Sequence, residues 1–94
     1  MDKELYQYLL SLNFEDDDIK FLCAICPGLE IISAERAFEN IAIVISYGYP
    51  EEDIDGLISA NPSFLLNVPE HLNEALAKLG EDIEEKLKNN PDLI

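Results

Sequence analysis

The stretch from Gly48 to Leu66 reads GYPEEDIDGLISANPSFLL and decides the fold. It opens with an acidic cluster, continues with apolar residues at helical spacing, and reaches a proline at position 62. Carboxylates favour the first turn of a helix, where backbone N–H groups are unpaired and the helix dipole is positive. Proline lacks an N–H and disfavours the α region for the residue before it, so the helix must end there. The apolar run Phe64 to Leu66 is too short for a helix of its own and predicts a 3₁₀ turn that fills the gap between helices, and Leu29, Ile31 and Ile32 predict the same turn earlier in the chain.

The same pattern recurs when the chain is compared with itself at a shift of 35 residues. The identical pairs at this shift include Glu4 and Glu39, Asp18-Ile19 and Asp53-Ile54, Leu22 and Leu57, Pro27 and Pro62, Glu35 and Glu70, Glu39 and Glu74, and Ala42 and Ala77. A third, partial copy lies 29 residues further on, where Asp82 and Asn90-Pro91 repeat Asp53 and Asn61-Pro62. The prolines therefore predict helix ends within two residues of positions 26, 61 and 90.

The second helix of each unit also has recognisable boundaries. Ser33 is a favourable N-cap, and Pro69 suits the first helical position. Gly48 and Gly80 stand where a left-handed residue usually closes a helix. The run Ile41 to Ile45 is apolar on every side, so we expect its helix to be the most buried. No run alternates polar and apolar residues with period two, so no strand is expected.

These patterns predict an all-α fold, a short helical-repeat stack of two-helix-plus-3₁₀ units with five or six α-helices. One domain spans residues 1–94, with a capping helix over 1–12, a first unit over 13–47, a second unit over 48–79 and a C-terminal half-unit over 80–94. The chain stops after Leu93-Ile94, in the middle of a unit. We expect this apolar edge to fold back onto Leu76 and Leu79, with Leu93 filling a gap as Phe64 does. Otherwise it is exposed and binds a partner or a second copy of the chain.

Composition narrows the function classes. The 94 residues include 20 acidic and 6 basic ones, which gives a net charge of −14 at pH 7. Such a charge repels nucleic-acid phosphate and attracts basic protein surfaces. No apolar run approaches the roughly 20 residues of a membrane span, and no secretory signal follows Met1. Two cysteines three residues apart cannot form a disulfide framework, which fits a reducing compartment, so we expect a cytoplasmic protein. We also expect no binding to a membrane.

Two clusters could carry chemistry. Cys23 and Cys26 form a C-x-x-C pair, but zinc needs four ligands and His71 is the only histidine. Reactive thiols usually lie at a helix N-terminus, whereas these two precede Pro27 at a helix end, so we expect both to be structural, with Cys23 in the core. The run Glu15 to Asp18 lacks the spaced oxygens and turn glycine of a calcium loop, which leaves metal binding as the minor alternative. No catalytic Ser/His/Asp set and no phosphate loop is present, so we expect no enzyme activity, no metal and no cofactor.

The stretch from Gly48 to Leu66, followed by Pro69-Glu70 and Leu72 to Leu79, resembles one repeat of the mitochondrial transcription termination factor (mTERF) family. The resemblance implies a curved stack of units that binds nucleic acid on a basic concave face and acts in organelle transcription or translation. This chain departs from that pattern in its charge, because its basic residues are only Lys3, Lys20, Arg36, Lys78, Lys86 and Lys88. A second, shorter likeness, over Leu12 to Phe14 or Tyr47 to Tyr49, is to the loop of ubiquitin-associated three-helix domains.

We therefore expect a non-enzymatic, acidic helical-repeat module that binds the basic surface of a protein partner, as an adaptor or a DNA-mimic-like inhibitor. Direct binding of nucleic acid is not expected. The alternative is an mTERF-like, nucleic-acid-associated transcription or translation factor, which convergence of the basic residues on one concave face would favour. A third class, a structural domain without a partner, predicts an unbroken polar surface. The candidate partner-binding residues are Glu35, Glu39, Glu70, Glu74, Leu93 and Ile94.

Overall fold

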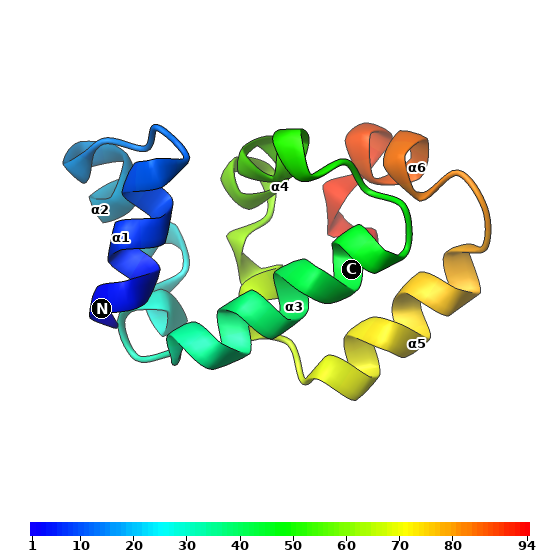
Figure 1. Ribbon diagram of the computed structural model, residues 1–94, viewed down its shortest axis with the longest axis horizontal. Coiled ribbons are helices and arrows are strands. Elements are labelled where there is room, and N and C mark those ends of the chain that lie inside the picture. The colour runs from blue at the N-terminus through cyan, green and yellow to red at the C-terminus, as the bar shows by residue number, and fades with distance from the viewer.

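The computed structural model describes residues 1–94, which form helices and 3₁₀ turns and no strand (Figure 1). The six α-helices are α1 (Lys3–Ser11), α2 (Asp16–Ile25), α3 (Ala34–Ser46), α4 (Ile54–Ala60), α5 (Pro69–Leu79) and α6 (Ile83–Asn89). The four 3₁₀ turns are η1 (Pro27–Glu30), η2 (Glu51–Asp53), η3 (Pro62–Leu66) and η4 (Pro91–Leu93). The all-α prediction is confirmed. None of the helices is both long and apolar enough to cross a membrane.

The three prolines that predicted helix ends each begin a 3₁₀ turn. The helices before them end at Ile25, Ala60 and Asn89, each within two residues of the predicted position. The residues immediately before the prolines are Cys26, Asn61 and Asn90, with φ of −137°, −147° and −146°. These residues leave the helical region because the proline ring would clash with them there.

The first and second helices of the units lie along opposite edges of the molecule. Figure 1 shows α2, α4 and α6 along its upper edge, with α3 and α5 below them. α3 packs against α1 and α5, and η3 packs against α3, α4 and η1. The molecule measures 35 × 22 × 20 Å, and one core of buried apolar residues runs through both units. The 3₁₀ turns thus lie between the helices, as expected of a stack.

The turn η3 is a central part of this core. Phe64 and Leu65 are completely buried, which stabilises the fold by roughly 1.5–3 kcal/mol for each side chain. In η1, the corresponding turn of the first unit, Leu29 is the only buried residue, and Ile31 just after it is 88% exposed. The expectation that Ile31 fills a gap is therefore wrong. The reason is that η1 ends at Glu30 and leaves Ile31 outside the turn.

Asn40 is a buried polar residue that connects α3 to η3. Its Nδ2 donates hydrogen bonds to the carbonyl oxygens of Phe64, Leu65 and Asn67 at 3.0, 3.1 and 2.9 Å. Such carbonyls need partners, because a buried acceptor without one costs about 1–3 kcal/mol. A single amide therefore ties the second helix of one unit to the turn of the next.

The predicted helix boundaries are also confirmed. The Ser33 side chain accepts a hydrogen bond from the Arg36 amide, and Pro69 is the first residue of α5. Gly48 and Gly80 have φ of +108° and +74° after the ends of α3 and α5. The acidic clusters are less regular than expected. Of the repeated clusters, only the one at α2 lies in the first helical turn, whereas residues 51–53 form η2 before α4, and Glu81 and Asp82 precede α6.

The side chains of Ile41 to Ile45 are not buried all round. Ile41 and Val44 are buried, Ile43 and Ile45 are half-buried, and Ala42 is exposed. The reason is that α3 packs against α1, α5 and η3, which leaves one of its sides uncovered. α3 still has five buried residues, more than any other helix, so the expectation that this helix is the most buried is confirmed by that count.

The C-terminal turn folds back onto the second unit, but its hydrogen bonds are with the residues on either side of η3 and not with the predicted Leu76 and Leu79 of α5. Asn61 Nδ2 donates to the Pro91 carbonyl at 2.8 Å, and Asn67 Nδ2 donates to the Ile94 carbonyl at 3.1 Å. The expected role of Leu93 is wrong, because Leu93 remains 40% exposed while Ile94 packs against the core. The physical reason is that α3 covers η3, whereas η4 packs mainly against α6.

Candidate protein-binding surface

The four acidic candidates lie on neighbouring helices. Glu35 and Glu39 are one turn apart on α3, Glu70 and Glu74 are one turn apart on α5, and all four are exposed. α3 packs against α5, and the Tyr47 hydroxyl donates to the Asn73 carbonyl across that contact at 3.4 Å. The structure thus brings the two acidic pairs onto adjacent helices.

The other two candidates belong to a different element. Leu93 and Ile94 lie in and after η4, which packs against α6 rather than against α3 or α5. The carbonyl of Ile94 is held by Asn67, and its side chain is half-buried. Of these two, Leu93 is the one that offers apolar surface to solvent.

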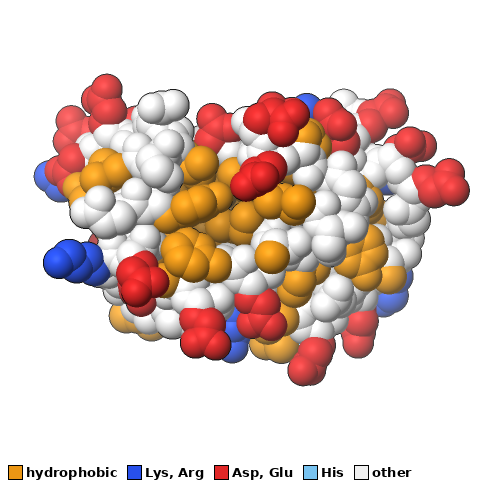
Figure 2. Space-filling model, in the orientation of Figure 1, with side chains coloured by type: hydrophobic (Ala, Val, Ile, Leu, Met, Phe, Trp, Pro, Cys, Tyr) orange, Lys and Arg blue, Asp and Glu red, His pale blue; other side chains and the backbone are white.

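An apolar groove runs between α1 and α3. This α1–α3 groove has a volume of about 310 Å³ and is lined by Tyr8, Phe38, Ile41, Ala42, Ile45 and Glu51. The rings of Tyr8 and Phe38 meet edge to face, with centroids 5.2 Å apart and an interplanar angle of 68°. Burial and the charge of Glu51 raise the pKa of Tyr8. Figure 2 shows hydrophobic side chains gathered along this face with acidic side chains around them.

The sequence did not predict this groove, because Phe38, Ile41 and Ile45 were expected to be core residues of their helix. The run Ile41 to Ile45 could have indicated the groove, because it is apolar on almost every side of its helix. A helix in a thin stack packs on only part of its circumference, so some of those side chains had to remain at the surface. Ala42 and Ile45 are two of them.

A second depression, the α2–α4 cleft, has a volume of about 370 Å³. Its lining includes Phe14, Asp18, Phe21, Leu22, Asp55 and Ser59. Phe21 is 64% exposed, and Ile25 on the next turn of α2 is 52% exposed. The outer side of α2 therefore exposes apolar side chains, and one of them, Phe21, lines the α2–α4 cleft together with the carboxylates of Asp18 and Asp55.

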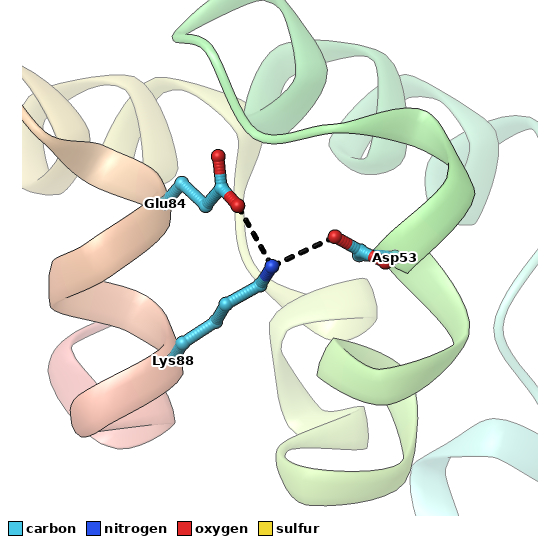
Figure 3. A network of polar contacts seen from close by, with 3 residues as sticks. All are labelled: Asp53, Glu84 and Lys88. Carbon is cyan, nitrogen blue, oxygen red and sulfur yellow. Dashed lines mark hydrogen bonds and ion pairs between the residues drawn. The ribbon is translucent and has the colours of Figure 1, made fainter.

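The corresponding cleft between α4 and α6 contains the chain's own lysine (Figure 3). Lys88 Nζ lies 2.7 Å from Asp53 Oδ2 and 2.8 Å from Glu84 Oε2, and 5.9 Å from the centre of the Tyr49 ring. Its hydrogen bonds with the two carboxylates raise the pKa of Lys88. This contact joins α6 to the turn η2 that precedes α4.

The six basic residues are spread over five helices. Besides Lys88, the Lys20 ammonium lies 3.0 Å from Asp16, and Lys86 donates to the Leu79 carbonyl. Three of the six basic side chains are therefore occupied by contacts within the chain. The face in Figure 2 shows separate basic side chains at its margins and no basic patch.

The cysteine thiols are protonated at neutral pH. Burial, together with a hydrogen bond to Glu30 and that residue's charge, raises the pKa of Cys23 to about 11. Burial also raises the pKa of Cys26. A protonated thiol is a poor nucleophile and a poor metal ligand. The prediction that Cys23 lies in the core is wrong, since Cys23 is half-buried against the core, whereas Cys26, the residue after the end of α2, is buried.

No group of three or more His, Cys, Asp or Glu side chains is arranged to hold a metal ion.

Comparisons with protein-family models, curated proteins and solved structures find no match to this chain. The geometry of the groove and the clefts is therefore the basis for assigning a function. These surfaces combine exposed apolar side chains with carboxylates.

Proposed function

We propose that the chain is a non-enzymatic, acidic module that binds a basic, amphipathic helix of a protein partner in the α1–α3 groove. The observation that carries the proposal is an apolar groove with a carboxylate in its lining, on a chain of net charge −14. An exposed apolar patch edged by polar residues is typical of a protein-binding site. The charge favours a partner of opposite sign and speeds its approach.

The groove suits the apolar stripe of a helix. Tyr8 and Phe38 supply aromatic surface at one part of the groove, and Ile41 and Ile45 lie one turn apart along α3. A bound helix contacts such a groove through residues three or four apart, in the same way as other helix-in-groove complexes. Lysine or arginine residues beside its apolar stripe would then lie near Glu51 and the exposed acids of α3.

The exposed apolar residues also argue against a domain without a partner. Such a domain predicts an unbroken polar surface, whereas Phe21, Ile25 and Ile31 are each more than half exposed. The proposal includes a cytoplasmic location, because a reducing compartment keeps unpaired thiols such as Cys23 and Cys26 from forming disulfides. If the partner's basic helix itself binds nucleic acid, the module acts as a DNA-mimic-like inhibitor, and otherwise it acts as an adaptor.

The alternative function is that of an mTERF-like factor associated with nucleic acid. It is supported by the order of elements in the second unit, where a helix, Asn61-Pro62, a 3₁₀ turn and a second helix follow one another. The distribution of basic residues supports it less, because Lys20, Lys86 and Lys88 are engaged within the chain. We therefore prefer the protein partner.

The test uses a fluorescein-labelled amphipathic helical peptide of leucine and lysine, titrated by fluorescence anisotropy in the presence of about 0.05 M and 0.15 M salt. Ala42→Lys adds a long cationic side chain to the groove. Ala77→Lys is the matched control, because Ala77 is the repeat equivalent of Ala42, is exposed on α5 and lies outside the groove. We expect Ala42→Lys to weaken binding about tenfold or more, and Ala77→Lys to weaken it no more than about threefold.

Equal effects of the two substitutions, or no binding by the wild type, would contradict the proposal. A labelled DNA duplex is titrated in parallel. We expect negligible DNA binding at about 0.15 M salt, at the weak end of non-specific affinity or below it. Micromolar DNA binding with a steep salt dependence would favour the mTERF-like alternative instead.

A further inference from the structure

We propose that the α2–α4 cleft binds a lysine side chain of the protein partner. The inference rests on the proposed function, because it takes the partner to be a basic protein. It comes from a comparison of two clefts within this chain, one of which contains a lysine while its counterpart contains none.

The two clefts are formed by equivalent residues of successive units. The equivalent pairs, with the residue of the α2–α4 cleft first, are Phe14 and Tyr49, Asp18 and Asp53, Leu22 and Leu57, Asp55 and Glu84, and Ser59 and Lys88. Every first member of a pair lines the α2–α4 cleft. Four of the second members line the α4–α6 cleft, and Glu84 contacts Lys88 there. The repeat register and the packing of the helices therefore give the same correspondence.

The α4–α6 cleft shows how these residues hold a cation. Asp53 from one unit and Glu84 from the next both contact Lys88 Nζ, at 2.7 and 2.8 Å, and the Tyr49 ring lies 5.9 Å away (Figure 3). Charge-assisted hydrogen bonds and an aromatic face are both favourable partners for an ammonium group. This arrangement is the template for the second cleft.

In the α2–α4 cleft, the ring and both acids are retained, and only the lysine is replaced. Phe14 provides the ring, Asp18 and Asp55 provide the carboxylates, and Ser59 occupies the position of Lys88. A serine side chain carries no charge, and none of the six basic residues lines this cleft. Asp18 Oδ2 accepts a hydrogen bond from the Glu15 amide at 2.8 Å, so its other oxygen is the one available to a ligand.

The chemistry of the lining favours a lysine side chain over a metal ion. A calcium ion takes six to eight oxygen ligands, and the cleft offers two carboxylates, one amide and one hydroxyl, from Asp18, Asp55, Asn13 and Ser59, among four apolar side chains. A lysine presents a charged end on an apolar four-carbon stem. The ammonium would meet Asp18 and Asp55, while the exposed ring of Phe21 would cover the stem. The cleft matches both parts of that side chain.

The probe for this site is Nα-acetyl-lysine methylamide, added to the ¹⁵N-labelled full chain and followed by amide-resolved NMR. We expect saturable shifts, in the millimolar range, at the amides of Phe14, Asp18, Asp55 and Ser59. Nα-acetyl-norleucine methylamide has an apolar side chain and no charge, and it should cause no such shifts. Absence of cleft shifts with the lysine probe, or equal shifts with both probes, would overturn the proposal.

The decisive variant is Ser59→Lys, which restores the residue found at the equivalent position 88. Its own lysine should fill the cleft and abolish the shifts caused by the probe. Ser59→Gln lengthens the side chain without adding charge and should retain the shifts. Because the new ion pair is exposed, Ser59→Lys should also melt about 1–4 °C above Ser59→Gln. Unchanged probe shifts in Ser59→Lys would contradict the proposed lysine site.

The basic helical peptide separates this inference from the proposed function. If the peptide binds the α1–α3 groove and the lysine probe leaves the cleft unaffected, the lysine site is wrong and the proposed function stands. If the probe shifts the cleft residues and the peptide binds nowhere, the proposed function is wrong and the cleft remains a lysine site without that partner.

Discussion

Asn40→Ala provides a direct test of how the two units are held together. The amide of Asn40 has two N–H donors, which serve three carbonyl oxygens at 2.9–3.1 Å in and after η3. The substitution leaves these buried acceptors without their donors, at a cost of about 1–3 kcal/mol for each bond that is not replaced. Allowing for two such bonds and for partial access of water, we expect the free energy of unfolding to fall by about 2–4 kcal/mol. In a domain of this size, that corresponds to a melting temperature lower by roughly 10–20 °C.

The assay is urea and thermal unfolding followed by circular dichroism. Asn40→Asp keeps the size of the side chain and removes the donors, so it should destabilise the fold at least as much as Asn40→Ala does. Asn73→Ala is the control, because Asn73 is exposed on α5 and should change stability by no more than about 0.5 kcal/mol. If Asn40→Ala costs no more than that control, the amide does not hold η3 to α3 and the reasoning is refuted.

Three further predictions concern individual side chains. The Tyr6 hydroxyl donates to Asp16 at 2.7 Å and lowers the pKa of Asp16, so Tyr6→Phe should raise that pKa toward its usual value in a ¹³C carboxyl titration. A carboxyl pKa that is lowered in the folded state stabilises the fold at pH values above the usual carboxyl pKa. The difference in stability between the wild type and Tyr6→Phe should therefore shrink as the pH falls below 3.8, and a difference that grows would contradict this role of Tyr6. Ile94→Ser should lower the melting temperature more than Leu93→Ser, since only Ile94 packs on the core, and equal losses would argue against the fold-back. With a pKa of about 11, Cys23 should react with iodoacetamide at pH 7.5 much more slowly in the folded chain than in urea, whereas equal rates would refute a protonated thiol.

The helix ends were predictable because they depend on covalent chemistry close to each residue. Pro27, Pro62 and Pro91 restrict the backbone before them whatever the rest of the chain does. The fate of an apolar side chain was harder to predict, because it depends on whether another helix covers it. Phe64 and Ile31 both follow a helix-ending proline, yet the first is buried and the second is exposed.

The candidate surface was predictable in part. Acids at helical spacing, such as Glu35 and Glu39, were expected on an exposed side of α3, where the structure places them. The α1–α3 groove was not predicted, because apolar periodicity identifies residues that avoid water and not the side of a helix that stays uncovered. The difference between Ser59 and Lys88 is present in the repeat register, but its meaning depends on the contact of Lys88 with Asp53, which lies 35 residues away in sequence.

The measurement that tests the central claim most directly is an amide-resolved NMR map of the basic helical peptide on the full-length chain. If the chain binds a basic helix as proposed, shifts should concentrate at Tyr8, Phe38, Ala42 and Ile45, saturate with added peptide, and weaken as salt is added. Shifts spread evenly over the acidic residues of all helices would mean charge attraction without a site. That result, or the absence of any shift, would contradict the assignment of this chain as a module that binds a basic protein partner.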